Sequence, residues 1–154
     1  LSFFLCEKAI NIDLPLCEQV GDFAFVQCPA PQINLPSAKI VGVLSFCHCD
    51  SLTDLSIPAV ESVGDSCIRA CAKLKSVKCK LSAKDFICEI FNCGICPVCN
   101  EEIEICLQRG NESHNLDLEK YNIQQEVDNL STQVRQLEKQ ALQHQQELTQ
   151  EKSQ

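Results

Sequence analysis

The sequence predicts an α/β repeat solenoid with short parallel strands, followed by a long α-helix. Cysteines recur at intervals of 21 or 22 residues, short alternating runs of apolar residues follow them, and the chain after residue 110 is Gln-rich and lacks Gly and Pro. A unit of this size with one short strand cannot bury both of its faces, so its copies must stack on one another. The recurring cysteines are Cys6, Cys28, Cys49, Cys71 and Cys93.

The repeated unit is defined by more than its Cys. Residues 20–28, 41–49 and 63–71 align, and each segment begins with Val-Gly and ends with Cys. We expect the shared Gly to lie in a turn with a positive φ, which glycine adopts at no steric cost. The alternating runs are typical of short strands, and in three units a Pro closes the run. The predicted strands lie within residues 10–15, 32–36, 52–58 and 74–79.

The 13 Cys among 154 residues at first indicate a disulfide scaffold or a metal protein. The repeat favours another interpretation, because nine of them occupy either the repeated Cys position or a position that is apolar in other units. We expect buried free thiols there, since Cys packs as a small hydrophobic residue. The nine predicted core cysteines are Cys6, Cys28, Cys49, Cys67, Cys71, Cys79, Cys93, Cys96 and Cys99. The repeat assigns no place to Cys17, Cys47, Cys88 and Cys106.

The pattern Val-Gly-Asp-x-Ala-Phe-x-x-Cys-x-x-Leu-x-x-Leu-x-Ile-Pro resembles the BspA-like type of leucine-rich repeat, found in bacterial and protist proteins. The resemblance covers residues 3–80 well and residues 81–106 in a decayed form. It implies a solenoid of about four to five units over residues 1–106, with the last unit decayed. It also implies binding of protein ligands, including adhesion at the cell surface, and no catalysis.

Departures from the pattern concentrate toward the end of the solenoid. Ile68 replaces the usual Phe, Lys80 stands at the usual Pro, and the unit at residues 85–102 has lost its Gly. These losses indicate that the solenoid ends there. At the other end, the sequence begins within a repeat and contains no Met, so we expect further repeats before Leu1.

A cysteine cluster within residues 88–106 competes with the repeat interpretation. Residues 93–99 contain two overlapping C-x2-C units, a spacing at which thiolates chelate Zn²⁺ or an iron–sulfur cluster when a fourth ligand lies nearby. Buried free thiols remain the preferred interpretation, with no metal or cofactor; disulfides and a zinc-binding module are the alternatives. The candidate zinc ligands are Cys93, Cys96, Cys99 and Cys106. Buried thiols favour the cytoplasm, whereas the family resemblance allows the cell surface, so the compartment stays open.

The C-terminal segment is predicted to be a coiled-coil helix over residues 116–154, after a linker at residues 107–115. Its apolar residues are spaced by three and four, which is typical of a coiled-coil seam. Val at heptad position a and Leu at d favour a parallel dimer. The predicted dimer contacts are Leu116, Ile123, Val127, Leu130, Val134 and Leu137. The alternatives are a single helix that packs back on the solenoid and a partly disordered tail.

Charge and hydropathy exclude several partners. The formal net charge is −8, and this acidic balance argues against a nucleic-acid surface, which would be rich in Lys and Arg. No apolar run approaches the roughly 20 residues of a membrane span. We therefore expect protein ligands of unknown identity.

The sequence does not predict an enzyme. It contains no Gly-rich phosphate loop, nucleophile elbow or paired-carboxylate motif, and only three His. Cys47 and His48 are adjacent, and adjacent side chains usually point apart, which is a poor geometry for activating a thiol. His48 is expected on the solenoid surface. The sequence thus predicts a non-catalytic protein–protein interaction module with a helix for oligomerisation.

Overall fold

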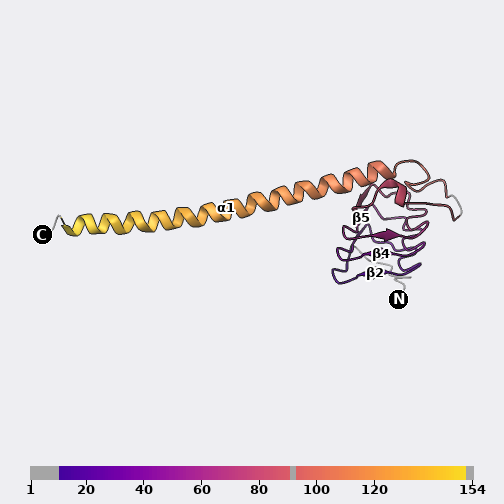
Figure 1. The fold of residues 1–154 in the computed structure, drawn as a ribbon, viewed down its shortest axis with the longest axis horizontal. Helices are drawn as coiled ribbons and strands as arrows, with labels where there is room; N and C mark the ends of the chain where they lie inside the picture. Colours follow the sequence, from indigo (N-terminus) through magenta and orange to yellow (C-terminus); the bar gives the residue numbers. More distant parts are fainter. Residues whose placement is uncertain (1–10, 91–92, 152–154) are drawn as a thin grey trace. The chain divides into compact units, whose positions relative to one another are not determined.

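The computed structural model describes residues 11–90 and 93–151, and the chain divides into two compact units, Leu1–His114 and Asn115–Gln154. The first unit is a solenoid of short parallel strands, which Figure 1 shows stacked one above another. Its first sheet has the order β1-β3-β5-β7 and its second the order β2-β4-β6. The strands of the first sheet are β1 (Asn11–Asp13), β3 (Gln32–Asn34), β5 (Asp54–Ser56) and β7 (Ser76–Lys78).

The first sheet confirms the strands predicted from the alternating runs. Each strand has three residues, and only its central side chain points into the core. The parallel register pairs residues that are 21 or 22 positions apart, so equivalent residues of successive units lie side by side. The resulting buried ladder consists of Ile12, Ile33, Leu55 and Val77.

The second sheet was not predicted, because its strands are too short to show an alternating pattern. Its strands are β2 (Gln19–Val20), β4 (Ile40–Val41) and β6 (Ser62–Val63). Each ends on the Val that precedes the repeated Gly, and the register aligns these Val residues.

The predicted role of the repeated Gly was wrong. Gly21, Gly42 and Gly64 have no positive φ; left-handed backbone occurs instead two residues later in each unit. A Cβ on Gly42 would lie 2.5 Å from the backbone nitrogen of Asp22 and 2.6 Å from the carbonyl carbon of Gly21. A Cβ on Gly64 would lie 2.6 Å from the carbonyl carbon of Gly42. Glycine is required at these two positions because the backbones of neighbouring turns approach closely there.

The core between the two sheets is built from ladders of equivalent side chains. The rings of Phe25 and Phe46 stack with centroids 5.3 Å apart, and both are buried. The repeated Cys adds a polar link: the Sγ of Cys49 donates to the carbonyl oxygen of Phe25 at 3.0 Å, and the Sγ of Cys71 donates to that of Phe46, also at 3.0 Å. A thiol at this position therefore satisfies a buried carbonyl of the previous turn as well as filling space.

Most of the predicted core cysteines are buried. Burial is confirmed for Cys28, Cys49, Cys67, Cys71, Cys79 and Cys96. The prediction was wrong for Cys93 and Cys99, which are half-buried; the decayed unit forms turns where earlier units form the strand that would hold Cys99. Cys6 lies outside the described residues. Cys47 and Cys106, which the repeat did not place, are also buried.

The end of the solenoid is closed by the beginning of a helix. After β7 and the short 3-10 helix η1 (Ala83–Asp85), the chain forms turns and enters α1 (Ile103–Glu151). The first turns of α1 bury Ile103, Cys106 and Leu107 in the solenoid core, and a Cβ on Gly110 would lie 2.6 Å from the backbone nitrogen of Lys78. Residues 107–115, predicted as a linker, are thus helical. This cap covers the last strand, as the ends of repeat proteins require.

The second unit is the remainder of α1. Its apolar side chains are exposed along the described part of the helix, including Leu116, Ile123, Val127, Leu130, Val134 and Leu137. Among the described residues, no helix combines the length and apolar character needed to cross a bilayer.

Candidate functional site

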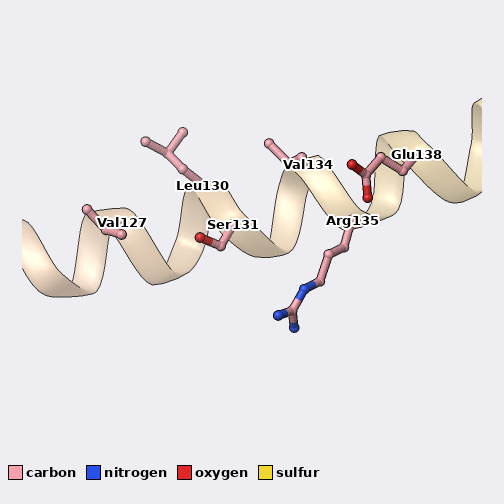
Figure 2. Close-up of a pocket in the computed structure, with 6 residues that line it drawn as sticks. All are labelled: Val127, Leu130, Ser131, Val134, Arg135 and Glu138. Atoms are coloured by element: carbon pink, nitrogen blue, oxygen red, sulfur yellow. The ribbon is translucent and has the colours of Figure 1, made fainter.

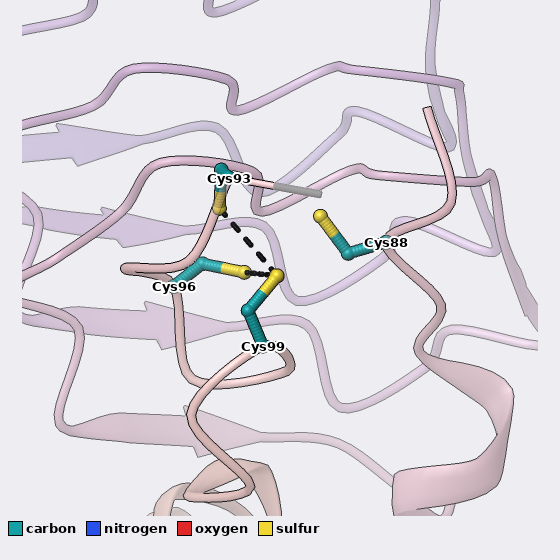
Figure 3. Close-up of side chains that lie close together, drawn as sticks. All are labelled: Cys88, Cys93, Cys96 and Cys99. Carbon is teal, nitrogen blue, oxygen red and sulfur yellow. Dashed lines mark hydrogen bonds between the residues drawn. The ribbon is translucent and has the colours of Figure 1, made fainter. Parts of the chain in front are cut away.

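Four cysteine side chains converge between the last strand and α1. The Sγ atoms of Cys88, Cys93, Cys96 and Cys99 all lie within 4.8 Å of one another, and Figure 3 shows them pointing toward a common centre. The Sγ of Cys99 is 3.6 Å from that of Cys93 and 3.5 Å from that of Cys96. We call these four residues the thiol cluster.

The turn that carries three members of the thiol cluster is held by backbone hydrogen bonds. Gly94 has a φ of 67°, which a tight turn between Cys93 and Cys96 uses. The N–H of Asn100 donates to the carbonyl oxygen of Cys96 at 3.0 Å, and the N–H of Glu102 donates to that of Pro97 at 2.8 Å. These bonds connect the turn directly to the start of α1.

Cys88 comes from a different segment, which is bonded to the preceding turn of the solenoid on both sides. The carbonyl oxygen of Ile87 accepts a hydrogen bond from the N–H of Ser66 at 2.9 Å. The N–H of Glu89 donates to the Oδ1 of Asp65 at 3.1 Å. The position of Cys88 beside the turn of Cys93 to Cys99 is therefore set by long-range contacts.

The pKa values of Cys93, Cys96 and Cys88 are shifted in different directions. Burial favours the neutral form of Cys93, but backbone N–H groups, including that of Ala70 at 3.4 Å from its Sγ, outweigh burial and lower its pKa to about 6. Burial raises the pKa of Cys96 and of Cys88 above the usual range. The thiol of Cys93 thus favours the thiolate form, whereas those of Cys96 and Cys88 favour the protonated form.

The structure brings together three of the four zinc ligands considered from the sequence. Cys106 lies elsewhere: it is buried, and its Sγ donates to the carbonyl oxygen of Leu74 at 3.5 Å. Cys88 is instead the fourth cysteine of the thiol cluster. The sequence contained one signal for this residue, because the repeat does not explain Cys88 and it precedes Cys93 by only five positions.

Cys47 and His48 have a poor geometry for a catalytic pair. His48 is exposed, as expected, whereas Cys47 is buried, and burial raises the pKa of its thiol despite the nearby Arg69. The guanidinium of Arg69 lies 3.2 Å from the Nε2 of His48 and 3.7 Å from the Sγ of Cys47. Because a guanidinium only donates, Nε2 is the acceptor and its lone pair is directed at Arg69, away from proton transfer.

The helix of the second unit carries an exposed apolar stripe. A shallow groove runs along it, and Figure 2 shows Leu130 and Val134 projecting from one side while Arg135 projects from the other. The groove is lined by Val127, Leu130, Ser131, Val134, Arg135 and Glu138. We call the exposed residues Leu116, Ile123, Val127, Leu130, Val134 and Leu137 the helix stripe. Each has between 48% and 63% of its surface exposed.

Comparison with known proteins supports the assignment to a repeat family. The family model described as a BspA type leucine-rich repeat region with 6 copies matches residues 1–95, which is more than half of the chain. Comparison with curated proteins and with solved structures returned no match. Repeats of this family indicate a protein-interaction module and are typically non-enzymatic. The matched residues contain both parallel sheets of the solenoid, and the chain belongs to the BspA type leucine-rich repeat family.

Proposed function

We propose that this protein is a non-catalytic interaction module that binds a protein ligand through its solenoid and forms a parallel homodimer through its helix. The repeat family supports the binding role. The single observation that carries the dimer is the helix stripe, whose six apolar side chains are about half exposed and occupy a and d positions of the heptad. The arrangement of Cys47, His48 and Arg69 supports the absence of catalysis.

A second copy of this chain is the partner that fits the helix stripe best. The stripe repeats with the heptad spacing, and a second copy offers the same spacing in register. Polar contacts lie away from it: the Nε2 of Gln124 donates to the Oδ1 of Asp128 at 2.9 Å, and Thr132 donates to the backbone of the same residue at 3.0 Å. The stripe is thus left for apolar packing.

The strength of such a dimer follows from the exposed area. Burying the exposed half of one stripe side chain is worth about 1 kcal/mol, so six from each helix contribute about 12 kcal/mol. Association costs at least about 4 kcal/mol in lost translation and rotation. The remainder corresponds to a dissociation constant of about 1 μM or weaker. A weak dimer that carries two solenoids still raises the avidity for a ligand with two epitopes.

Sedimentation of matched variants tests the dimer. We expect the full-length protein to sediment as a dimer at tens of micromolar and Leu130→Glu to sediment as a monomer, because the new carboxylate lies in the seam. Gln125→Glu adds the same charge at an exposed position outside the seam and should remain dimeric. A monomeric wild-type protein at this concentration, or equal disruption by both variants, would contradict the proposal.

The boundary between the two units supplies a second test. A chain that ends at residue 114 retains the buried turns of α1 and lacks the helix stripe. It should be monomeric and should keep the circular dichroism of the strands. If it sediments as a dimer, the solenoid itself associates and the helix is not the dimerisation element.

A further inference from the structure

We propose that Cys88, Cys93, Cys96 and Cys99 bind one Zn²⁺ ion, which fixes the last turn of the solenoid to the start of α1. This goes beyond the interaction role, because it concerns how the end of the repeat is held together. The ligand set differs from the one considered from the sequence, since Cys88 replaces Cys106.

The spacing of the four sulfurs fits a single tetrahedral ion. With a Zn–S distance of about 2.3 Å, tetrahedral ligands lie about 3.8 Å apart. The observed separations of 3.6 Å between Cys93 and Cys99 and 3.5 Å between Cys96 and Cys99 are close to this value, and all four Sγ atoms lie within 4.8 Å of one another. A four-iron cluster binds each thiolate to a different iron and needs the sulfurs farther apart.

The hydrogen bonds of the thiol cluster differ from those of the core cysteines. In the core, Cys49 and Cys71 donate their thiol protons to buried carbonyl oxygens. In the cluster, the Sγ of Cys93 instead accepts a hydrogen bond from the backbone N–H of Ala70 at 3.4 Å. An N–H that points at sulfur stabilises a thiolate, and such outer contacts orient metal ligands. Cys93 is therefore held by a contact that suits a metal-bound thiolate, which the thiols of Cys49 and Cys71 lack in their bonds to carbonyl oxygens.

Charge near the cluster also suits a metal–thiolate centre. Zn²⁺ with four thiolates carries a net charge of −2, and its formation releases the thiol protons to solvent. The guanidinium of Arg69 interacts electrostatically with both Cys88 and Cys93. This cation partly offsets the charge that the bound centre would carry.

The position of the cluster explains why a metal would be useful there. Between β7 and α1 the described residues form one short 3-10 helix and turns, with few buried apolar side chains. A segment with so little core commonly depends on a metal or a disulfide for stability. Binding at Cys88 and at the turn of residues 93–99 would join the segment after β7 to the segment that leads into α1.

Metal analysis of the full chain tests the site. We expect one zinc per chain after reconstitution under reducing conditions, and Co²⁺ substitution should give the visible bands of a tetrahedral thiolate site. Cys99→Ser, a change at a half-buried position, should abolish both signals. Cys106→Ala removes a buried thiol outside the cluster and should retain both. A zinc chelator should lower the melting temperature of the wild type and leave that of Cys99→Ser unchanged.

Four results would overturn the proposal. Far less than one metal per chain after reconstitution would show that the thiols do not form a site. Loss of metal in Cys106→Ala, with normal strand circular dichroism, would show that the ligand set is wrong. A disulfide between cluster cysteines, seen by mass spectrometry in protein purified without reductant and persisting with excess zinc, would replace the metal. Iron bound at one per chain in preference to zinc would contradict the identity of the ion.

Discussion

Replacing Gly110 by Ala is expected to destabilise the protein, although the same change in a solvent-exposed helix is stabilising. In a helix interior, Ala is favoured over Gly by about 1 kcal/mol. At this position, however, the new Cβ would lie 2.6 Å from the backbone nitrogen of Lys78 and nearer still to the carbonyl group of Val77. Both of these are backbone atoms at the end of β7, so neither can rotate out of the way.

The magnitude follows from what must move to relieve this overlap. The beginning of α1 has to shift away from β7, which loosens the packing of Ile103, Cys106 and Leu107 in the core. Overpacking of a well-packed core costs about 1–3 kcal/mol, and contact with rigid backbone places the cost at the upper end. After subtraction of the helix-propensity gain, the free energy of unfolding should fall by about 1–2 kcal/mol.

Thermal unfolding followed by circular dichroism measures this effect. A loss of 1 kcal/mol lowers the melting temperature by about 4–8 °C in a domain of 60–100 residues. Asn111→Ala is the matched control, because Asn111 is exposed on the same helix and its replacement should be neutral or slightly stabilising. All samples need one protein concentration, since dimerisation also shifts the transition. If Gly110→Ala melts at or above the wild-type temperature, α1 does not pack against β7 as described.

Three further predictions concern single side chains. Ser45→Ala should raise the free energy of unfolding, measured by urea titration, by about 1 kcal/mol. The buried Oγ of Ser45 has no hydrogen-bond partner among the described residues, and the aligned position of the previous unit holds Ala24. A loss of stability would contradict this reasoning. Hydrogen bonds from the hydroxyl and the N–H of Ser82 hold the pKa of Asp85 below its usual range. The Asp85 carboxylate therefore stabilises the fold at a pH above its pKa in the unfolded chain, and this stabilisation is lost as the pH falls through its pKa in the folded protein. Ser82→Ala should raise that pKa in a carboxyl NMR titration, and an unchanged value would refute the assignment. The hydrogen bond with the side chain of Cys49, followed by burial, raises the pKa of Cys71 well above the usual range, so alkylation measured by mass spectrometry should reach Cys71 only when the protein unfolds.

The repeat explains why the first sheet could be predicted and the second could not. A three-residue strand with one buried side chain leaves an alternating trace in the sequence, and the trace recurs with each unit, as at Ile33 and Leu55. A two-residue strand such as β4 leaves no such trace. The recurrence of Gly could be read from the sequence, but the reason for it could not. Glycine is required because Gly42 lies close to the backbone of the previous turn, and this distance is set by the stacking of the units.

The thiol cluster was also predicted only in part from the sequence. The turn from Cys93 to Cys99 is local, so its spacing alone indicates a chelating geometry. The sequence alternative took Cys106 as the fourth ligand, although Cys88 lies five positions before Cys93 and Cys106 lies seven positions after Cys99. The start of α1 directs Cys106 into the core toward Leu74, and contacts with the preceding turn bring Cys88 to the cluster.

The sequence by itself determined the period of the solenoid, the positions of its longer strands and the spacing of the helix stripe, since each of these follows from side-chain order along one element. Only the tertiary structure decided which thiols meet, why Gly42 must be glycine and where the helix begins to cap the last strand. These three features depend on distances between backbones that are 20 or more residues apart or that belong to different elements. A local sequence pattern does not predict such distances, because they are set by the stacking of the units and the packing of the elements.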